Sequence, residues 1–499
     1  MELREHQRAA LLAWLMLSAV TTAPYVANAL APPRGARFVG AFFYRDDYYQ
    51  YLSFAEQASR GHLVFRNKFD PRPHRPALVN LEWATAGILA ASTGTGIVIG
   101  FHLVRLLAIG GLLWGAARLL HDAGLTGNHL RWALALVATG SGLGWLRVSM
   151  GRPAFLVPDV NMGLYPFHQA LFNGHFASGT ALLVGSLALH QAWRSAAKPR
   201  WPWMLSATAL GLVRPFDLAT FLLACGVLAA LQAVRPADAR SAWEQIASLA
   251  GLLPVLVYLG LLFVIHPSFR LWSGPQNAVR APLPLDLAFA LGPALGFAAL
   301  GLRGQAPASK PCAWRLLVAW ASAVALLLSV DIGFAPQVAT SLGTLAVFAA
   351  AVLTPKRLLP VAVACLIPTS LFLLRLASEP RSSAFASEDY FRATRWLSAR
   401  CRDGDVLLAP TDLSQMAAGL TPCSVVQGHR VLTPDFESRI AEADRFLDPA
   451  TPTEWSRDYV LRTGARFVAA ERLAAPALTA AGCALAVDLG RFALWVCAR

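Results

Sequence analysis

The chain has 499 residues, of which 56% are hydrophobic and 14% are charged, and its mean hydropathy is +0.48. So much apolar surface excludes an ordinary soluble globule and predicts a polytopic α-helical membrane protein. The formal net charge of +14 would suggest a nucleic-acid partner in a soluble protein. Here many arginines stand in short loops between apolar runs, so we expect contact with membrane lipids or lipid phosphates and no nucleic acid.

The first apolar run covers residues 9–30 and ends in "ANALA", which resembles the small-residue cleavage site of a signal peptide. The run is also long enough to cross a bilayer, which takes about 20 residues, and more runs follow. We therefore expect it to be the first transmembrane helix, with a cleaved signal peptide as the alternative.

Ten further apolar runs of spanning or near-spanning length predict about 11–13 spans in all. They cover residues 96–118, 132–149, 168–193, 202–213, 216–234, 244–265, 285–302, 314–331, 335–353 and 358–376. Residues 76–93 are a possible further run, but Asn80, Glu82 and Trp83 fit an interfacial or re-entrant helix about as well as a span.

Basic residues recur in the loop after every second run, and the positive-inside rule makes these loops cytoplasmic. They are Arg118 and Arg131, then Arg194, Lys198 and Arg200, then Arg235 and Arg240, then Arg303, Lys310 and Arg315, then Lys356 and Arg357. The loops 150–167 and 266–284 then face outward, together with the C-terminal region. The first outer loop, residues 31–95, is itself basic, which suggests an anionic ligand there or attraction to anionic lipid.

From about residue 380 the composition becomes that of a soluble domain, so we predict a transmembrane domain over 1–379 and a small α/β domain over 380–499. "SEDYFRATRWLSAR" predicts a helix, and "DVLLAP", "CSVVQG", "ARFVAA" and "FALWVCAR" predict strands. A second helix over "TPDFESRIAEADRFL" is expected to have Thr433 as its cap and Pro434 at its first position. Four cysteines of this region, Cys401, Cys423, Cys483 and Cys497, allow two disulfides in three pairings if it faces an oxidising compartment.

Paired carboxylates, Asp46 and Asp47, follow the first apolar run. They precede aromatic and apolar residues that predict an amphipathic helix lying along the outer membrane surface: Tyr48, Tyr49, Tyr51, Leu52, Phe54 and Ala55. The helix dipole should keep both carboxylates ionised. An ionised carboxylate there can accept a proton from an attacking hydroxyl or hold a divalent metal, although a helix cap with a solvated neighbour explains the pair equally well.

The arrangement resembles the GT-C superfamily of integral-membrane glycosyltransferases. The likeness rests on a first apolar helix, "DDYYQYLSFAEQASRG" in the first outer loop, many short spans and a small outer α/β domain. The residues that match the superfamily motif are Asp46, Asp47, Tyr49, Tyr51, Ala55 and Gly61. The resemblance implies transfer of a sugar from a polyprenyl-phosphate or polyprenyl-diphosphate donor on the extracytoplasmic side. It also implies that Asp46, with Asp47 as the second candidate, acts as base or binds the acceptor or a metal.

Further polar residues are candidates for binding the substrate. Arg214 stands at a helix break in "RPFD", where a charge is costly without an anionic partner, and pairing with Asp217 is the alternative. Among the outward basic residues, His266, Arg270 and Arg280 could also meet the lipid phosphate. Asp159, His168 and His175 lie near the junction of loop 150–167 with a span, and the seven-residue spacing of the two histidines would place them on one helix face. His429 follows a predicted strand. α/β domains often bind ligands at the carboxyl end of a strand, and an ordinary surface turn is the alternative.

We therefore expect sugar transfer to a glycan, lipid or protein acceptor by single displacement with an Asp base. No other acidic cluster accompanies Asp46 and Asp47, so we favour no metal cofactor. The alternatives are a transporter or flippase of a lipid-linked substrate, and a non-catalytic scaffold of the same fold. The scarcity of lysine, with only Lys68, Lys198, Lys310 and Lys356, suggests a bacterial inner-membrane protein whose C-terminal domain is periplasmic.

Overall fold

The computed structural model describes residues 4–196, 199–234, 239–274, 282–304, 311–330, 335–448, 450–470, 474–490 and 492–498. The chain divides into two compact units. The first unit comprises Met1–Ala27, Val104–Leu259 and Ala278–Glu379, and the second comprises Asn28–Leu103, Gly260–Asn277 and Pro380–Arg499. The predicted domain division at residue 380 stays a prediction. Arg280 lies outside the described residues.

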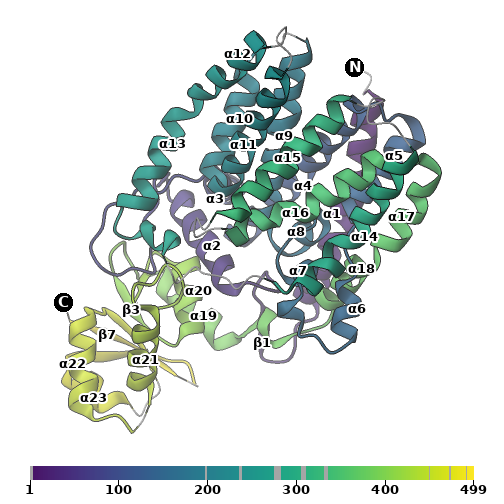
Figure 1. The fold of residues 1–499 in the computed structure, drawn as a ribbon. Coiled ribbons are helices and arrows are strands. Elements are labelled where there is room, and N and C mark those ends of the chain that lie inside the picture. The colour runs from purple at the N-terminus through teal and green to yellow at the C-terminus, as the bar shows by residue number, and fades with distance from the viewer. Residues whose placement is uncertain are drawn as a thin grey trace. The chain divides into compact units, whose positions relative to one another are not determined.

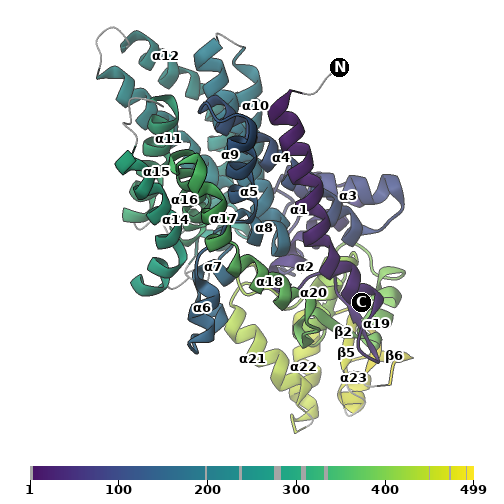
Figure 2. The ribbon, with the colours of Figure 1, turned by 90° about the vertical axis from the view of Figure 1, so that its right-hand side faces the viewer.

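The first unit is helical. Its helices are α1 (Glu5–Leu30), α4 (Ile97–Asp122), α5 (Gly127–Thr139), α6 (Gly144–Ser149), α7 (Pro158–Asn161), α8 (Pro166–Phe172), α9 (Gly174–Ala196), α10 (Trp201–Val213), α11 (Pro215–Ala233), α12 (Ala239–Leu249), α13 (Leu253–Gly260), α14 (Pro284–Gly304), α15 (Pro311–Ser329), α16 (Ala335–Leu353), α17 (Leu359–Leu366) and α18 (Pro368–Ser378). Figure 1 shows α9, α10 and α11 side by side, with α15 against α11. In Figure 2, α1 runs beside α4, and the Trp14 indole donates to the Leu106 carbonyl between them.

Six helical segments of the described residues are long and apolar enough to cross a membrane. They are Glu5–Leu30, Ile97–Asp122, Pro215–Ala233, Arg240–Ile265, Pro284–Arg303 and Lys356–Ser378. Shorter apolar helices lie at Trp201–Val213, Ala313–Ser329 and Gln337–Leu353. The chain is thus a polytopic helical membrane protein, as predicted, and the run over 202–234 is two helices that meet at Arg214, as expected.

Two predicted spans are interrupted. The run 132–149 breaks after α5 because Gly140 is extended and the next amides bond outside the helix, Ser141 N–H to the Leu366 carbonyl and Leu143 N–H to the Phe289 carbonyl. The run 168–193 breaks at Asn173, which has φ −142° and ψ 93° and whose side chain accepts from the Phe176 N–H at 3.3 Å. The expectation that His168 and His175 share one helix face is therefore wrong, because they lie on α8 and α9.

The second unit combines the first outer loop with the C-terminal region. Its helices are α2 (Arg45–Ser59), α3 (Leu81–Thr93), α19 (Glu388–Ser398), α20 (Thr411–Leu420), α21 (Phe436–Leu447), α22 (Thr453–Thr463) and α23 (Ala475–Ala480), with a π-helical turn (Leu261–Ile265) and a 3-10 helix (Phe269–Ser273). Strand β1 (Ala36–Phe38) pairs antiparallel with β2 (Phe385–Ser387). The Asn67 amide donates to Ser268 Oγ and to the Leu432 carbonyl, both at 2.8 Å, so one side chain joins three distant segments.

The C-terminal region is an α/β domain, as predicted. Its sheet has the order β4-β3-β5-β7-β6, with β3 (Val406–Leu408), β4 (Ser424–Val425), β5 (Phe467–Ala470), β6 (Cys483–Asp488) and β7 (Ala493–Cys497). Strands β4, β3 and β5 are parallel, whereas β7 is antiparallel to β5 and β6. The four cysteines form the disulfides Cys401–Cys423 and Cys483–Cys497. We did not predict β6, whose middle residues are exposed.

The cap predicted for the helix after Gly428 is wrong. Helix α21 begins at Phe436, and Asp435 at its N-cap has φ 51°. The Thr433 hydroxyl instead accepts from the His429 N–H at 3.2 Å, so it closes the turn that precedes the helix. The Thr433 hydroxyl is used in this turn because the buried N–H of His429 needs a hydrogen-bond partner.

Helix α3, which covers most of the ambiguous 76–93 segment, has 13 residues and Asn80 as its cap. At 1.5 Å per residue it is about 20 Å long, shorter than a bilayer core of about 30 Å. It packs along α2. The length and this packing favour the interfacial interpretation over a span.

Helix α2 is more buried than an amphipathic surface helix, which corrects our expectation. All residues from Tyr48 to Ala58 are buried, because α3 packs on one side and α20 on another. The close approach of α3 and of α20 to α2 depends on one glycine in each of these two helices. A Cβ on Gly87 would lie 2.2 Å from the Ala55 carbonyl oxygen, and one on Gly419 would lie 2.8 Å from Tyr49 Cδ1.

We predict that Gly87→Val separates α3 from α2 and lowers the melting temperature of the protein, since overpacking typically costs about 1–3 kcal/mol and here the obstacle is backbone. Ala91→Val, on the exposed side of α3, is the matched control and should leave the melting temperature nearly unchanged. Thermal unfolding in detergent measures both. Equal melting temperatures for the two variants would contradict the close packing of α2 and α3.

Candidate active site

Asp46 and Asp47 occupy the first turn of α2. Tyr44, the residue just before α2, has φ 55° and ψ 49°, a left-handed conformation that a bulky residue rarely adopts. Such backbone is found where the surroundings dictate it, and it clusters at functional sites. The sharp entry into α2 places the two carboxylates at the start of a helix that is otherwise buried.

His429 lies against Asp47. Its Nε2 is 3.3 Å from Asp47 Oδ1, and the two residues are 382 positions apart in the sequence. The His429 Nδ1 accepts the N–H groups of Val431 and Leu432, both at 3.1 Å. Since Nδ1 is an acceptor, the neutral ring carries its proton on Nε2 and donates it to the carboxylate. The side chain of Asp47 is 38% exposed and that of His429 only 2%, so the carboxylate remains accessible while its partner is fixed.

The turn that carries His429 is held from several directions. Its own N–H donates to Thr433 Oγ1, and the carbonyl of Gly428 accepts from the Gln415 amide at 2.7 Å. The ring of Phe69 lies 5.5 Å from the His429 ring, measured between centroids. A Cβ on residue 428 would lie 3.1 Å from Phe69 Cδ1, so the close approach suits glycine. The imidazole thus has little freedom to turn away from Asp47.

The electrostatics of Asp46 differ from our expectation. Burial raises the pKa of Asp46 above its ordinary value of 3.8, the neighbouring Asp47 raises it further, and His429 and backbone N–H groups oppose the shift. The helix dipole does not set the direction of this shift, because desolvation and the like charge of Asp47 outweigh the backbone N–H groups. A carboxylate with a raised pKa is a stronger base once it is ionised.

Arg45 directly precedes the pair in the chain. Arg45 Nη1 lies 3.6 Å from Asp412 Oδ2 at the start of α20, and the Arg45 guanidinium is 5.9 Å from the Tyr49 ring centroid. Its side chain is 16% exposed. Nothing local in the sequence distinguishes Arg45 from the other basic residues of the first outer loop.

The other end of α2 is fixed by a buried ion pair that we did not predict. Lys68 Nζ lies 2.9 Å from Glu56 Oε2 and donates to the Thr421 carbonyl at 2.6 Å, and Arg60 also pairs with Glu56. Burial lowers the pKa of Lys68, and Glu56 counteracts this shift. The pair ties α2 to the segment that enters β4 and so helps to set the position of the two carboxylates.

Arg214, in the first unit, is paired. Its Nη1 lies 2.9 Å from Asp217 Oδ2, and its Nη2 donates to Thr340 Oγ1 at 2.8 Å and to the Gln337 carbonyl at 3.1 Å. The guanidinium also lies 4.5 Å from the Phe176 ring centroid. Pairing with Asp217, the alternative weighed from the sequence, is thus present, and it satisfies a charge that is 2% exposed.

The remaining candidates are Asp159, His168, His175 and Arg270. None of them is close to the carboxylate pair in sequence, and the buried ones form hydrogen bonds with other parts of the protein. Asp159 Oδ2 accepts the Gly144 N–H at 2.8 Å, and burial raises the pKa of Asp159 to about 6. His168 Nε2 bonds the Val160 carbonyl at 2.9 Å, while His175 lies partly buried at the start of α9. Arg270, in the second unit, is exposed. Among the described residues, no group of three or more His, Cys, Asp or Glu side chains could hold a metal ion.

No protein-family model matches the sequence, and no curated protein matches it. Solved structures do match. ArnT from Cupriavidus metallidurans, bound to undecaprenyl phosphate, matches with a TM-score of 0.53 and 13% identity over 97% of both chains. The oligosaccharyltransferase AglB from Archaeoglobus fulgidus, in complex with an inhibitory peptide and a dolichol-phosphate, matches with a TM-score of 0.54 and 10% identity over 93% of this chain and 69% of that one.

A further structure of the Archaeoglobus fulgidus oligosaccharyltransferase, in complex with Zn and sulfate, matches with a TM-score of 0.53 and 11% identity over 92% of this chain and 68% of that one. These proteins are GT-C membrane glycosyltransferases. This chain has the GT-C fold. At these identities the likeness establishes the fold, and the GT-C resemblance inferred from the first-loop carboxylates is confirmed at that level.

We predict that Asp46→Asn raises the melting temperature near neutral pH. The pKa of Asp46 is raised by folding, so its ionisation costs stability progressively as the pH rises from 3.8 to the raised value. The gain from Asp46→Asn should therefore grow over that window and shrink again in acid. Melting curves from pH 4.5 to 8 test this, with the exposed Asp458→Asn as control. A variant less stable than wild type at pH 8 would contradict the raised pKa.

We predict that Arg214→Met is strongly destabilising, by about 3–5 kcal/mol, because Asp217 is left buried without its cation. The double variant Arg214→Met, Asp217→Leu should recover most of the melting temperature. A double variant as unstable as Arg214→Met would contradict a structural role for the pair.

Proposed function

We propose that the protein transfers a sugar from a polyprenyl-phosphate or polyprenyl-diphosphate donor to a glycan, lipid or protein acceptor on the extracytoplasmic side of the membrane. The observation that carries the proposal is the contact of Asp47 with His429 beside Asp46. It joins the carboxylate pair of the first loop to the Gly-His turn of the C-terminal domain, and both were singled out from the sequence as candidates. The GT-C fold supports the reaction class.

The donor class rests on chemistry and on the comparisons. The matching structures of ArnT and AglB contain undecaprenyl phosphate and dolichol-phosphate, respectively. A lipid phosphate carries negative charge into a membrane site, where a basic group would stabilise it as it leaves. We propose Arg270 for this contact, because it is exposed, belongs to the same compact unit as the carboxylates and has no ion-pair partner among the described residues.

In the proposed step, the acceptor hydroxyl attacks the anomeric carbon of the donor sugar. A bond forms between the acceptor oxygen and that carbon, the bond from the carbon to the phosphate oxygen breaks, and the lipid phosphate departs with the bonding electrons. Asp46 takes the hydroxyl proton, for which its raised pKa suits it. Asp47 accepts a hydrogen bond from His429 Nε2–H, so it stays oriented and helps to position the acceptor.

The step needs no metal ion, since a carboxylate base and a cationic phosphate contact account for both proton transfer and leaving-group charge. We therefore expect sugar transfer to continue in excess EDTA. The residues Asp159, His168 and His175 have internal hydrogen-bond partners or lie at helix starts, and we propose that they shape the segment that joins α7, α8 and α9.

The proposed location is the bacterial inner membrane, with the C-terminal domain in the periplasm. The Cys401–Cys423 and Cys483–Cys497 disulfides support this side, because disulfides persist in oxidising compartments and are rare in the cytosol. The excess of arginine over lysine supports a bacterial source. Both disulfides lie in the domain that the positive-inside pattern places outside.

We predict that the purified protein releases sugar from one member of a panel of polyprenyl-phosphate sugars when cell-envelope lipids are supplied as acceptors. Asp46→Asn should lower turnover by a factor of about 100 or more, the usual range for losing a general base. Asp47→Asn should reduce it less, because Asp47 positions rather than accepts the proton. Radiolabelled or mass-spectrometric product analysis measures each rate.

The exposed Asp458→Asn is the matched control and should keep wild-type turnover. Melting curves of every variant separate lost chemistry from lost folding. Wild-type rates in both folded Asp46→Asn and Asp47→Asn would remove the carboxylates from the mechanism. Uptake or release of the intact lipid-linked donor without sugar transfer would favour the transporter alternative.

A further inference from the structure

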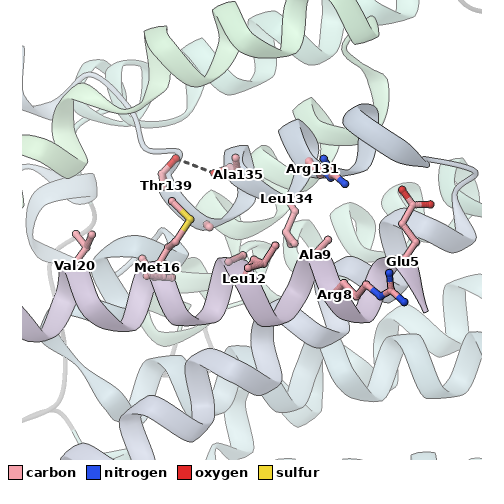
Figure 3. Close-up of a pocket in the computed structure, with 13 residues that line it drawn as sticks. Glu5, Arg8, Ala9, Leu12, Met16, Val20, Arg131, Leu134, Ala135 and Thr139 are labelled. Atoms are coloured by element: carbon pink, nitrogen blue, oxygen red, sulfur yellow. Dashed lines mark hydrogen bonds between the residues drawn. The ribbon is translucent and has the colours of Figure 1, made fainter. Parts of the chain in front are cut away.

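A groove of about 560 Å³ runs between α1 and α5 in the first unit. The carboxylate pair belongs to the second unit. It is lined by Glu5, Arg8, Ala9, Leu12, Ala13, Met16, Leu17 and Val20 of α1 and by Arg131, Leu134, Ala135, Ala138 and Thr139 of α5. Figure 3 shows the charged side chains at one end and the apolar ones along the rest. The groove is thus amphipathic along its length.

The apolar part is shaped by small residues on both helices. Ala9 and Ala13 of α1 and Ala135 and Ala138 of α5 line the groove, and larger side chains at these positions would fill part of it. The Leu12 and Met16 side chains are 61% and 70% exposed. The Thr139 hydroxyl donates to the Ala135 carbonyl at 2.8 Å, so its hydrogen bond is made within α5. The walls therefore suit a hydrocarbon chain.

The charged end is net positive. Glu5 Oε1 accepts the Gly127 N–H at the start of α5 at 2.6 Å, so this carboxylate is already engaged with backbone. Arg8 and Arg131 are exposed, and neither has a carboxylate within 4.0 Å among the described residues. Arg118, nearby in the chain, does pair, with Asp122. Two guanidiniums at the mouth of an apolar groove are complementary to a phosphate group with a hydrocarbon tail.

The length of the groove favours a lipid of one leaflet. From Arg8 to Val20 the α-helical rise is about 18 Å. Half of a bilayer core is about 15 Å, which is the reach of one phospholipid acyl chain. A polyprenyl chain shares the phosphate chemistry but is much longer than the groove.

We propose that this groove binds one anionic phospholipid of the cytoplasmic leaflet, with its phosphate between Arg8 and Arg131 and an acyl chain along α1. The positive-inside pattern places Arg131 on that side. The lipid would hold the N-terminal helix against α5. This site is independent of the proposed sugar transfer, since none of its residues belongs to the carboxylate site.

Native mass spectrometry of the full-length protein tests the site, with phosphatidylglycerol, phosphatidylethanolamine and undecaprenyl phosphate as competing probes. Wild type should retain one phosphatidylglycerol in preference to phosphatidylethanolamine. Each of Arg8→Ala and Arg131→Ala should weaken retention about fivefold, the effect typical of one basic residue near an anionic lipid surface. Arg240→Ala removes an exposed arginine, also predicted cytoplasmic, outside the groove and should change nothing.

A second variant tests the apolar wall without changing charge. Ala13→Trp should fill the groove and displace the lipid, whereas Leu15→Trp, on an exposed part of α1 that does not line it, should not. Equal retention of phosphatidylethanolamine, or unchanged retention in both arginine variants, would overturn the proposal. Preferential, arginine-dependent retention of undecaprenyl phosphate would overturn the assignment to a membrane phospholipid.

Discussion

The contact between Asp47 and His429 is the constraint on which the candidate site depends. Two adjacent carboxylates at a partly buried helix start repel each other, and burial penalises the ionised form of Asp46. A fixed imidazole that donates to one of them relieves this strain and leaves the other with a raised pKa. One carboxylate of the site is therefore oriented by a hydrogen bond, and the other has a raised pKa.

Much of the second unit serves to keep that contact in place. Residues of the first loop and of the C-terminal region are joined by the β1–β2 pair, by the Asn67 amide and by the hydrogen bond from Lys68 to the Thr421 carbonyl. Removing one partner of any of these contacts would lower the stability of the fold, because a buried polar group would be left without a hydrogen-bond partner. The position of the carboxylates is thus tied to the fold of a domain more than 300 residues away in the chain.

The sequence was informative wherever the pattern is local. Apolar runs predicted the long helices of the first unit, apolar segments of the C-terminal region predicted β3, β4, β5 and β7, and the Asp-Asp motif led to the GT-C fold. The sequence did not predict the long-range contacts. Nothing local shows that α2 is buried on most sides, that Thr433 closes a turn instead of capping a helix, or which cysteines pair. The separation of His168 from His175 depends on a single extended residue, Asn173, inside an apolar run.

The central claim is that sugar transfer takes place at Asp46 and Asp47. The most direct measurement is a cryo-electron microscopy structure of the protein with a non-transferable polyprenyl-phosphate sugar analogue. The account predicts that the anomeric carbon lies beside the Asp46 carboxylate, with room for an acceptor hydroxyl between them and with the Asp47–His429 contact intact. An analogue bound with its sugar away from both carboxylates would contradict it.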